Sequence, residues 1–181
     1  MTTNTASHFS TDQQKHEAER SPQWPAFRDA FIKKNPVCVC CGSTVGLQAH
    51  HVFPFHYCIA LGRPDLELNE GNLITLCEHE EGKQAENHHL LIGHLDDFES
   101  SNLDVRHDAT VTYKNWTAAQ IQADAGWQQK KAKRLPHIGD MTANDKAAFK
   151  WAMNTVNLDA NNPPGPKPEN LPDWIPATLR S

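Results

Sequence analysis

Cysteine and histidine, the side chains that bind zinc, gather between positions 38 and 94 of this 181-residue chain. Cys38 and Cys41 have the two-residue spacing that lets a pair of thiolates hold one tetrahedral zinc, and the glycine after them allows the backbone to turn. Cys77 follows about 36 residues later, within the range of split zinc sites. A redox pair would normally open a helix after a strand, whereas here Pro36 precedes the pair. We therefore predict a structural zinc.

The spacing alone does not identify the fourth zinc ligand, because His79 and His88 are both close to Cys77 in sequence. Cys40 could replace Cys38 as a ligand, but the two-residue spacing fits tetrahedral geometry better. Cys58 has no partner in sequence, and we interpret it as a small buried apolar residue.

Histidine is abundant, with eleven in the chain. Six of them fall within about 40 residues, a density that favours a metal site: His50, His51, His56, His79, His88 and His89. His50 and His51 end a predicted strand, on which adjacent side chains point to opposite faces. One imidazole could therefore hold a metal while its neighbour faces another target, such as an attacking water.

The pair His88 and His89 offers the same division, one imidazole toward the thiolates and the other toward a second metal. His94 lies five residues beyond His89, not the four that would place both on one helical face. Gly93 between them indicates a bent or broken helix.

The elements that must position these residues are short. Residues 21–34 read as a helix, with Ser21 as N-cap and apolar residues at helical spacing, and Asn35-Pro36 ends it. Residues 45–52 read as a strand, 53–70 as a long loop, and 72–77 as a second apolar segment. Beyond Val105, scattered tryptophans and aliphatic residues predict two helices that pack onto the module.

Hydrophobic content of 38% and a mean hydropathy of -0.65 are low, so part of the chain is expected to lie outside a core. Residues 1–20 are polar and predict a disordered tail. Residues 161–181 carry six prolines and predict an extended, non-helical tail. We expect the site module within 21–105, and a helical extension over 106–160.

Four segments in order, CxxCG, AHHVFPF, NLITLC and NHHLLIGH, resemble the HNH endonucleases, and most closely the small phage and bacterial members. The resemblance covers residues 21–105. It implies an α+β fold, a small ββα-metal core with a zinc knuckle, flanking helices and disordered termini. It also implies a metal-dependent DNA endonuclease that leaves 5′-phosphate and 3′-hydroxyl ends.

Residue by residue, the resemblance implies His51 as the general base and Asn72 as the residue that braces the loop orienting this base. It implies His50 and His89 as ligands of the catalytic metal, with His94 as the third. The family usually has four zinc-binding cysteines, and this chain has His88 where many relatives carry the fourth. We therefore assign the structural zinc to Cys38, Cys41, Cys77 and His88, with His79 as the rival for the last position.

A neutral histidine near its ordinary pKa can take a proton from water, and a dication can stabilise phosphate charge. The nitrogen ligands favour Zn²⁺, Ni²⁺, Mn²⁺ or Co²⁺ as the catalytic metal, and Mg²⁺ fits if DNA supplies oxygens. A second hypothesis is a catalytically silent zinc module that docks nucleic acid or protein. A different metal-dependent hydrolase ranks last, because HExxH and a serine elbow are missing.

The net charge of -5 and pI near 6.1 are not typical of a nucleic-acid-binding protein, but basic and acidic residues are separated along the chain. Residues 20–63 and 105–136 are basic, and 64–104 hold eleven acids and one lysine. The predicted DNA phosphate contacts are Arg28, Lys33, Lys34, Arg63, Lys130, Lys131 and Arg134. The lysine-rich cluster of residues 130–134 can equally be a solvated helix face.

The sequence has no apolar run long enough to span a membrane and no secretory signal. We therefore expect a cytoplasmic protein of a bacterium or phage-infected cell, with DNA as its partner. Homing, restriction and DNA packaging beside other phage proteins stay open as biological roles.

Overall fold

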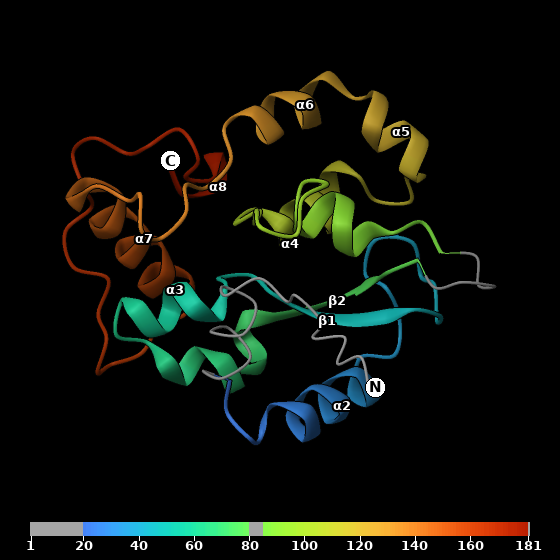
Figure 1. Ribbon diagram of the computed structural model, residues 1–181, viewed down its shortest axis with the longest axis horizontal. Helices are drawn as coiled ribbons and strands as arrows, with labels where there is room; N and C mark the ends of the chain where they lie inside the picture. Colours follow the sequence, from blue (N-terminus) through green and yellow to red (C-terminus); the bar gives the residue numbers. More distant parts are fainter. Residues whose placement is uncertain (1–19, 80–84, 181) are drawn as a thin grey trace, which may run out of the picture.

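A two-stranded antiparallel sheet lies at the centre of the computed structural model, which describes residues 20–79 and 85–180 (Figure 1). Strand β1 (Leu47–His51) pairs with β2 (Leu73–Cys77), so that His50 lies opposite Ile74 and His51 opposite Leu73. All five residues of β2 are buried. Elements therefore cover both faces of this small sheet, and alternate residues of β1 face different neighbours.

Helix α2 (Trp24–Lys34) covers one face of the sheet and confirms the predicted first helix. Trp24 and Phe31 form a small apolar cluster with Leu73 of β2. The helix begins at Trp24 rather than after Ser21. The Ser21 hydroxyl accepts from the Gln23 N–H in the turn before the helix, and the Ser21 backbone N–H donates to the Glu67 carboxylate. This contact joins the chain before α2 to the segment between the strands.

The segment between the strands was expected to be a long loop, and this expectation is wrong. It contains helix α3 (Phe55–Ala60) and two short 3₁₀ helices, Pro64–Leu68 and Glu70–Asn72. Pro54 caps α3 and Pro64 opens the next helix, positions where the missing N–H of proline costs no hydrogen bond. The prolines that suggested a loop therefore mark helix starts.

After β2 the chain forms one π-helical turn, η3 (His89–Gly93), where a bent helix was predicted. Leu95 and Asp96 follow with positive φ angles of 53° and 64°, which reverse the chain direction. Strands β1 and β2 and the helical turn η3 therefore come in this order along the chain. The described part of the chain is a small α+β structure.

The C-terminal half holds more helical segments than the two predicted. They are α4 (Val105–His107), η4 (Asp108–Thr112), α5 (Ala118–Ala123), α6 (Ala125–Ala132), α7 (Ala143–Val156) and α8 (Ala177–Arg180). Capping boxes start α5 at Thr117 and α7 at Thr142. Trp127 and Phe149 lie in the same apolar core as Leu76 of β2, so this half packs on the module as predicted.

The C-terminal segment is not the extended, non-helical tail expected from its prolines. Ile175 is buried in the main core and α8 forms one turn. Apolar side chains between the prolines supply this burial. The polar N-terminal tail lies outside the described residues, except for Arg20. No described helix is long and apolar enough to cross a membrane.

Candidate metal centres

Four side chains form a cluster that could hold a metal ion such as zinc: Cys38, Cys41, Cys77 and His88. Their ligand atoms all lie within 4.8 Å of one another. The Sγ of Cys77 is 3.3 Å from Nδ1 of His88 and 3.8 Å from Sγ of Cys41. The structure therefore brings together the four residues assigned to the structural zinc. His79 is exposed and is not in this cluster.

Backbone contacts hold the thiols in place. The Gly42 N–H donates to the Cys38 carbonyl, and Gly42 has a φ of 75°, which favours glycine. The neighbouring Val39 N–H donates to the Thr75 carbonyl of β2, which fixes the knuckle to the strand that ends at Cys77. Cys40 is not one of the four clustered residues, and its thiol donates to the Tyr113 carbonyl.

The electrostatics of the cluster favour a thiolate. The hydrogen bond from Cys77, together with the contact to His88, lowers the pKa of Cys38 to about 3. Burial works to lower the pKa of His88, but its contacts with Cys38 and Cys40 raise it to about 11. Nε2 of His88 is bonded to the Trp116 carbonyl, which leaves Nδ1 toward the sulfurs. Thiolate is the form in which cysteine binds metal.

A second cluster consists of His50, His89 and His94, whose ligand atoms also lie within 4.8 Å of one another. The ring centroids are 4.8 to 5.3 Å apart, and the rings meet edge to face. His50 comes from β1, and the other two flank the single turn of η3. Because a π-helical turn closes between residues five apart, the five-residue spacing that broke the α-helical pattern brings these rings together.

The nitrogen atoms of this cluster fit a metal ion. Nε2 of His50 and Nδ1 of His89 are buried and have no hydrogen-bond partner among the described residues. Nδ1 of His94 is 2.8 Å from the Ser100 carbonyl, which leaves its Nε2 free to bind. Buried polar atoms without partners are costly, and a ligand that satisfies them removes this cost. Burial and the neighbouring histidines lower the pKa of His50 well below 6.5 and that of His94 to about 4, so both are neutral, the metal-binding form.

Glu78 is a site residue that sequence reasoning missed. Its Oε2 lies 3.5 Å from Nδ1 of His89, and the proximity of His89 lowers the pKa of Glu78. Its position directly after Cys77, at the end of β2, was the only available signal. The carboxylate lies beside the same nitrogen that lacks a hydrogen-bond partner, so it adds negative charge where the histidine cluster could bind a cation.

His51 lies on the other face of β1 from His50, against α2. Its ring stacks on Trp24 with centroids 4.5 Å apart, and its Nε2 is 2.9 Å from the Glu67 carbonyl. Burial lowers the pKa of His51 to about 4, and the side chain is only 7% exposed. If Nε2 carries the hydrogen and donates to this carbonyl, Nδ1 remains as the proton acceptor.

Asn72 is fully buried and braces the segment between the strands. Its Oδ1 accepts from the Phe53 backbone N–H, and its Nδ2 donates to the carbonyls of Phe53 and Leu66. Leu66 precedes Glu67, whose carbonyl contacts His51. Asn72 therefore holds the backbone next to the carbonyl that contacts His51.

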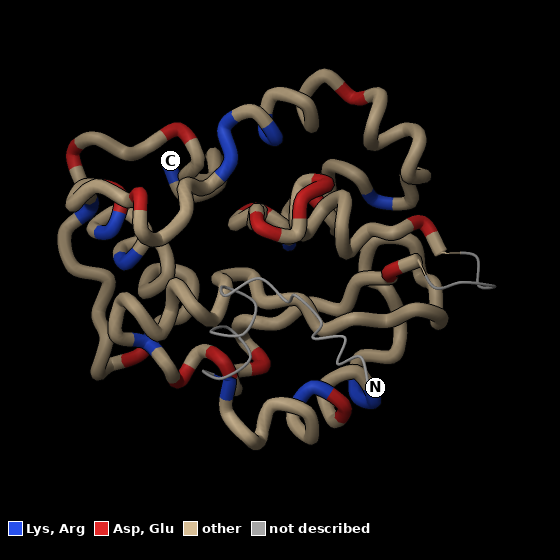
Figure 2. Tube along the Cα trace, in the orientation of Figure 1, with Lys and Arg blue, Asp and Glu red and all other residues tan. Residues whose placement is uncertain are grey.

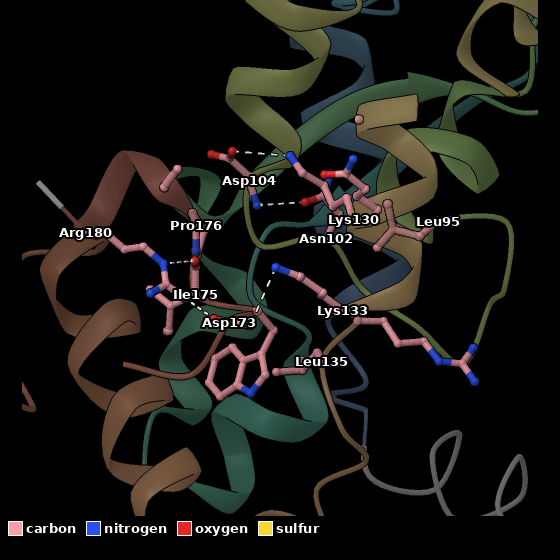
Figure 3. Close-up of a pocket in the computed structure, with 15 residues that line it drawn as sticks. Leu95, Asn102, Asp104, Lys130, Lys133, Leu135, Asp173, Ile175, Pro176 and Arg180 are labelled. Atoms are coloured by element: carbon pink, nitrogen blue, oxygen red, sulfur yellow. Dashed lines mark hydrogen bonds and ion pairs between the residues drawn. The ribbon is translucent and has the colours of Figure 1, made fainter. Parts of the chain in front are cut away.

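Asp104, His107 and Asp108 form a third cluster of potential ligands, but a lysine already pairs with both of its carboxylates. The ammonium of Lys130 is 2.5 Å from Asp108 and 3.4 Å from Asp104. Lys130 also lines a cavity of about 330 Å³ between α6 and the C-terminal segment (Figure 3). Lys133 and Arg180 in its wall each lie near Asp173, so acids accompany the basic side chains there as well.

One predicted DNA contact, Arg63, is contradicted. Arg63 is 1% exposed, and its guanidinium is bonded to Asp65 and Asn154, so it supports the fold. Five of the other six form ion pairs: Arg28 with Asp29, Lys34 with Glu70, Lys130 with Asp108, Lys131 with Asp96, and Arg134 with Asp97. Figure 2 shows the basic residues of α2 and α6 on opposite sides of the view.

The chain matches no protein-family model, no curated protein and no solved structure. Its function is therefore argued from the two metal centres alone.

Proposed function

We propose that this protein is a metal-dependent DNA endonuclease of the HNH kind, in which the cysteine cluster stabilises the fold and the histidine cluster serves the reaction. The observation that carries the proposal is the second cluster: three edge-to-face imidazoles, of which His50 and His89 each have a buried nitrogen without a hydrogen-bond partner among the described residues. His50 lies on the strand that also bears His51. A site with three protein ligands leaves positions for water and phosphate.

His50, His89 and His94 would hold the divalent cation, with Glu78 beside His89. Such an ion, when bound, supplies Lewis-acid stabilisation of charge on a phosphate. The imidazole donors suit Zn²⁺, Ni²⁺, Co²⁺ or Mn²⁺, and Mg²⁺ would need additional oxygen ligands from DNA.

His51 is the proposed general base. Donation from Nε2–H to the Glu67 carbonyl fixes the ring and leaves the lone pair on Nδ1, which takes a proton from the attacking water. The low pKa of His51 keeps this nitrogen unprotonated at neutral pH. Asn72 holds the Leu66–Glu67 segment against the ring, so it acts as a positioning residue. The water oxygen attacks phosphorus, the bond from phosphorus to the 3′ oxygen breaks, and that oxygen takes a proton from solvent, which gives 5′-phosphate and 3′-hydroxyl ends.

Metal-dependent cleavage of plasmid DNA tests the proposal. The purified chain should nick or cut plasmid with added Mn²⁺, Ni²⁺ or Mg²⁺, and EDTA should abolish the activity. His51→Ala should retain the fold and DNA binding, but lose cleavage by about 10²- to 10⁴-fold. His79→Ala is the matched control, because His79 is exposed and outside both clusters. Full cleavage activity in His51→Ala would show that His51 is not the general base.

A metal-binding module without catalysis is the second candidate function, favoured by the burial of His51 against Trp24. A base that water cannot reach would not cleave DNA. Under this alternative, metals still bind both clusters, and plasmid stays intact with every divalent cation tried.

A further inference from the structure

The loop after His94 holds an aromatic ring over the histidine cluster. Phe98 is 57% exposed, and its ring centroid lies 5.1 Å from that of His94 and 6.0 Å from that of His89. Both histidines are ligands in the proposed function. An exposed aromatic ring in contact with these histidines is placed to touch whatever binds at the cation, and covering it with an apolar group is favourable.

The backbone that places Phe98 is strained and tightly held. Leu95 and Asp96 both have positive φ, which is unfavourable for residues other than glycine. Backbone N–H groups of Asp96 and Asp97 donate to the carbonyls of Leu90 and His94, so the loop folds back on η3. Strain of this kind persists where the surrounding structure enforces it, often at binding sites.

Two basic residues, one in α6 and one just after it, form ion pairs with the same loop. Lys131 pairs with Asp96 at 2.8 Å, and Arg134 pairs with Asp97. The Ser100 carbonyl accepts from His94, which closes the loop on the far side of Phe98. The ring is thus presented on a fixed loop, and little conformational entropy is lost when a flat ligand stacks on it.

The charges around Phe98 select which part of a nucleotide it contacts. The cations that contact this loop, Lys131 and Arg134, are already paired with Asp96 and Asp97, and Glu99 next to Phe98 adds a negative charge. A phosphate therefore gains little there except at the cation itself. An uncharged base is the part of a nucleic acid that an exposed phenyl ring stabilises by stacking. A base inside a continuous duplex has both faces covered by its neighbours, so only an unpaired base can stack on Phe98.

We infer that Phe98 stacks on an unpaired base next to the scissile phosphate, and that single-stranded or locally unpaired DNA is the preferred substrate. This inference rests on the proposed function and specifies its substrate class. Phe98 is a specificity-determining residue that touches the substrate without taking part in proton transfer.

Binding and cleavage of oligonucleotides test the inference separately. The probes are a single strand with 2-aminopurine at successive positions, the same strand with one abasic position, and the paired duplex. The variants are Phe98→Leu, which keeps apolar area without the aromatic face, and Phe98→Trp, which keeps the face. Leu158→Ala is the control, because Leu158 is also exposed but is not in ring contact with the cluster.

Stacking on one base contributes about 5- to 150-fold in affinity. Phe98→Leu should lose affinity for the single strand within that range, with little change for the duplex, and Phe98→Trp should bind like the wild type. One 2-aminopurine position should be quenched in the wild type and not in Phe98→Leu. Co²⁺ absorption should be the same in all variants, which excludes damage to the metal site.

Equal binding of all three probes by the wild type and Phe98→Leu would overturn the inference, even if plasmid is cut. Phe98-dependent binding of the single strand without cleavage under any metal would support the stacking contact between Phe98 and an unpaired base, and would reject the nuclease and with it the substrate preference. If the wild type bound no oligonucleotide, both would be rejected.

Discussion

At the scale of single residues, Glu78 connects the two candidate metal clusters. It follows Cys77 of the cysteine cluster, and its carboxylate approaches Nδ1 of His89 in the histidine cluster. His88 and His89 make the same connection from the other side, with one ring in each cluster. Two pairs of adjacent residues, Cys77–Glu78 and His88–His89, thus fix the distance between the two clusters. A shift of either pair would displace a side chain in each cluster.

Glu78→Gln should weaken binding of the second metal by about 10- to 100-fold, because it removes a negative charge that lies beside a ligand histidine and favours a bound dication. Titration of zinc-saturated protein with Co²⁺ against a chromophoric chelator measures this affinity. Glu99→Gln is the control, an exposed acid on the loop that bears Phe98. Unchanged Co²⁺ affinity in Glu78→Gln would show that the carboxylate has no part in the site.

At the scale of elements, the packing of η3 on β1 requires a glycine. A Cβ on Gly93 would lie 2.8 Å from Cε1 and 2.9 Å from Nδ1 of His50, closer than real contacts allow. Both residues are buried, so neither can move away without cost. Gly93→Ala should displace the His50 ring, reduce stability by about 1–3 kcal/mol and abolish binding of the second metal.

Thermal unfolding and Co²⁺ titration measure these two effects of Gly93→Ala. Gly139→Ala is the matched control, because a Cβ there meets nothing within 4 Å. Wild-type Co²⁺ affinity in Gly93→Ala would contradict the close approach of the turn to His50.

Sequence patterns were informative wherever chemistry fixes spacing. The CxxC pair, the adjacent histidines and the helix over residues 24–34 could be predicted, because thiolate geometry, strand alternation and helical periodicity leave local signatures. The five-residue gap between His89 and His94 was correctly seen as wrong for an α-helix, but nothing local indicates a π-helical turn. The burial of Arg63 depends on Asn154, 91 residues away, and no local pattern carries that contact.

At the scale of the whole molecule, a buried thiol and a buried phenol in α3, those of Cys58 and Tyr57, link the free energy of unfolding to pH. Burial raises the pKa of the Cys58 thiol from 9.0 to about 12 and that of the Tyr57 hydroxyl from 10.0 to about 12. Above pH 9 the unfolded chain loses the Cys58 proton and the folded chain keeps it, so the folded state binds more protons and stability falls as pH rises.

Urea unfolding between pH 8 and pH 10.5, with zinc present, should show a free energy of unfolding that declines above about pH 9 by up to about 1.4 kcal/mol per pH unit for each such group. Cys58→Ala should decline less steeply over the first unit, where Tyr57 does not yet titrate in the unfolded chain. Parallel curves for the two proteins would mean that the Cys58 thiol ionises in the folded state.

The cysteine cluster also joins the two halves of the chain. Nε2 of His88 bonds the Trp116 carbonyl, the Cys40 thiol bonds the Tyr113 carbonyl, and the Asn115 N–H donates to the Cys40 carbonyl. These contacts attach the segment before α5 to the knuckle. A metal that orders the knuckle therefore also orders the interface with the C-terminal helices.

Zinc binding to such ligand sets supplies about 10–16 kcal/mol at neutral pH, comparable with the whole stability of about 5–15 kcal/mol of a typical domain. Cys77→Ser should therefore lose the cooperative thermal transition and near-ultraviolet circular dichroism, and strong chelators should do the same to the wild type. His94→Ala should keep both signals and lose only the second metal, because that cluster fastens a single turn to β1. If Cys77→Ser and the metal-free wild type both kept a cooperative thermal transition, the apolar core alone would sustain the fold. The cysteine cluster would then need another role.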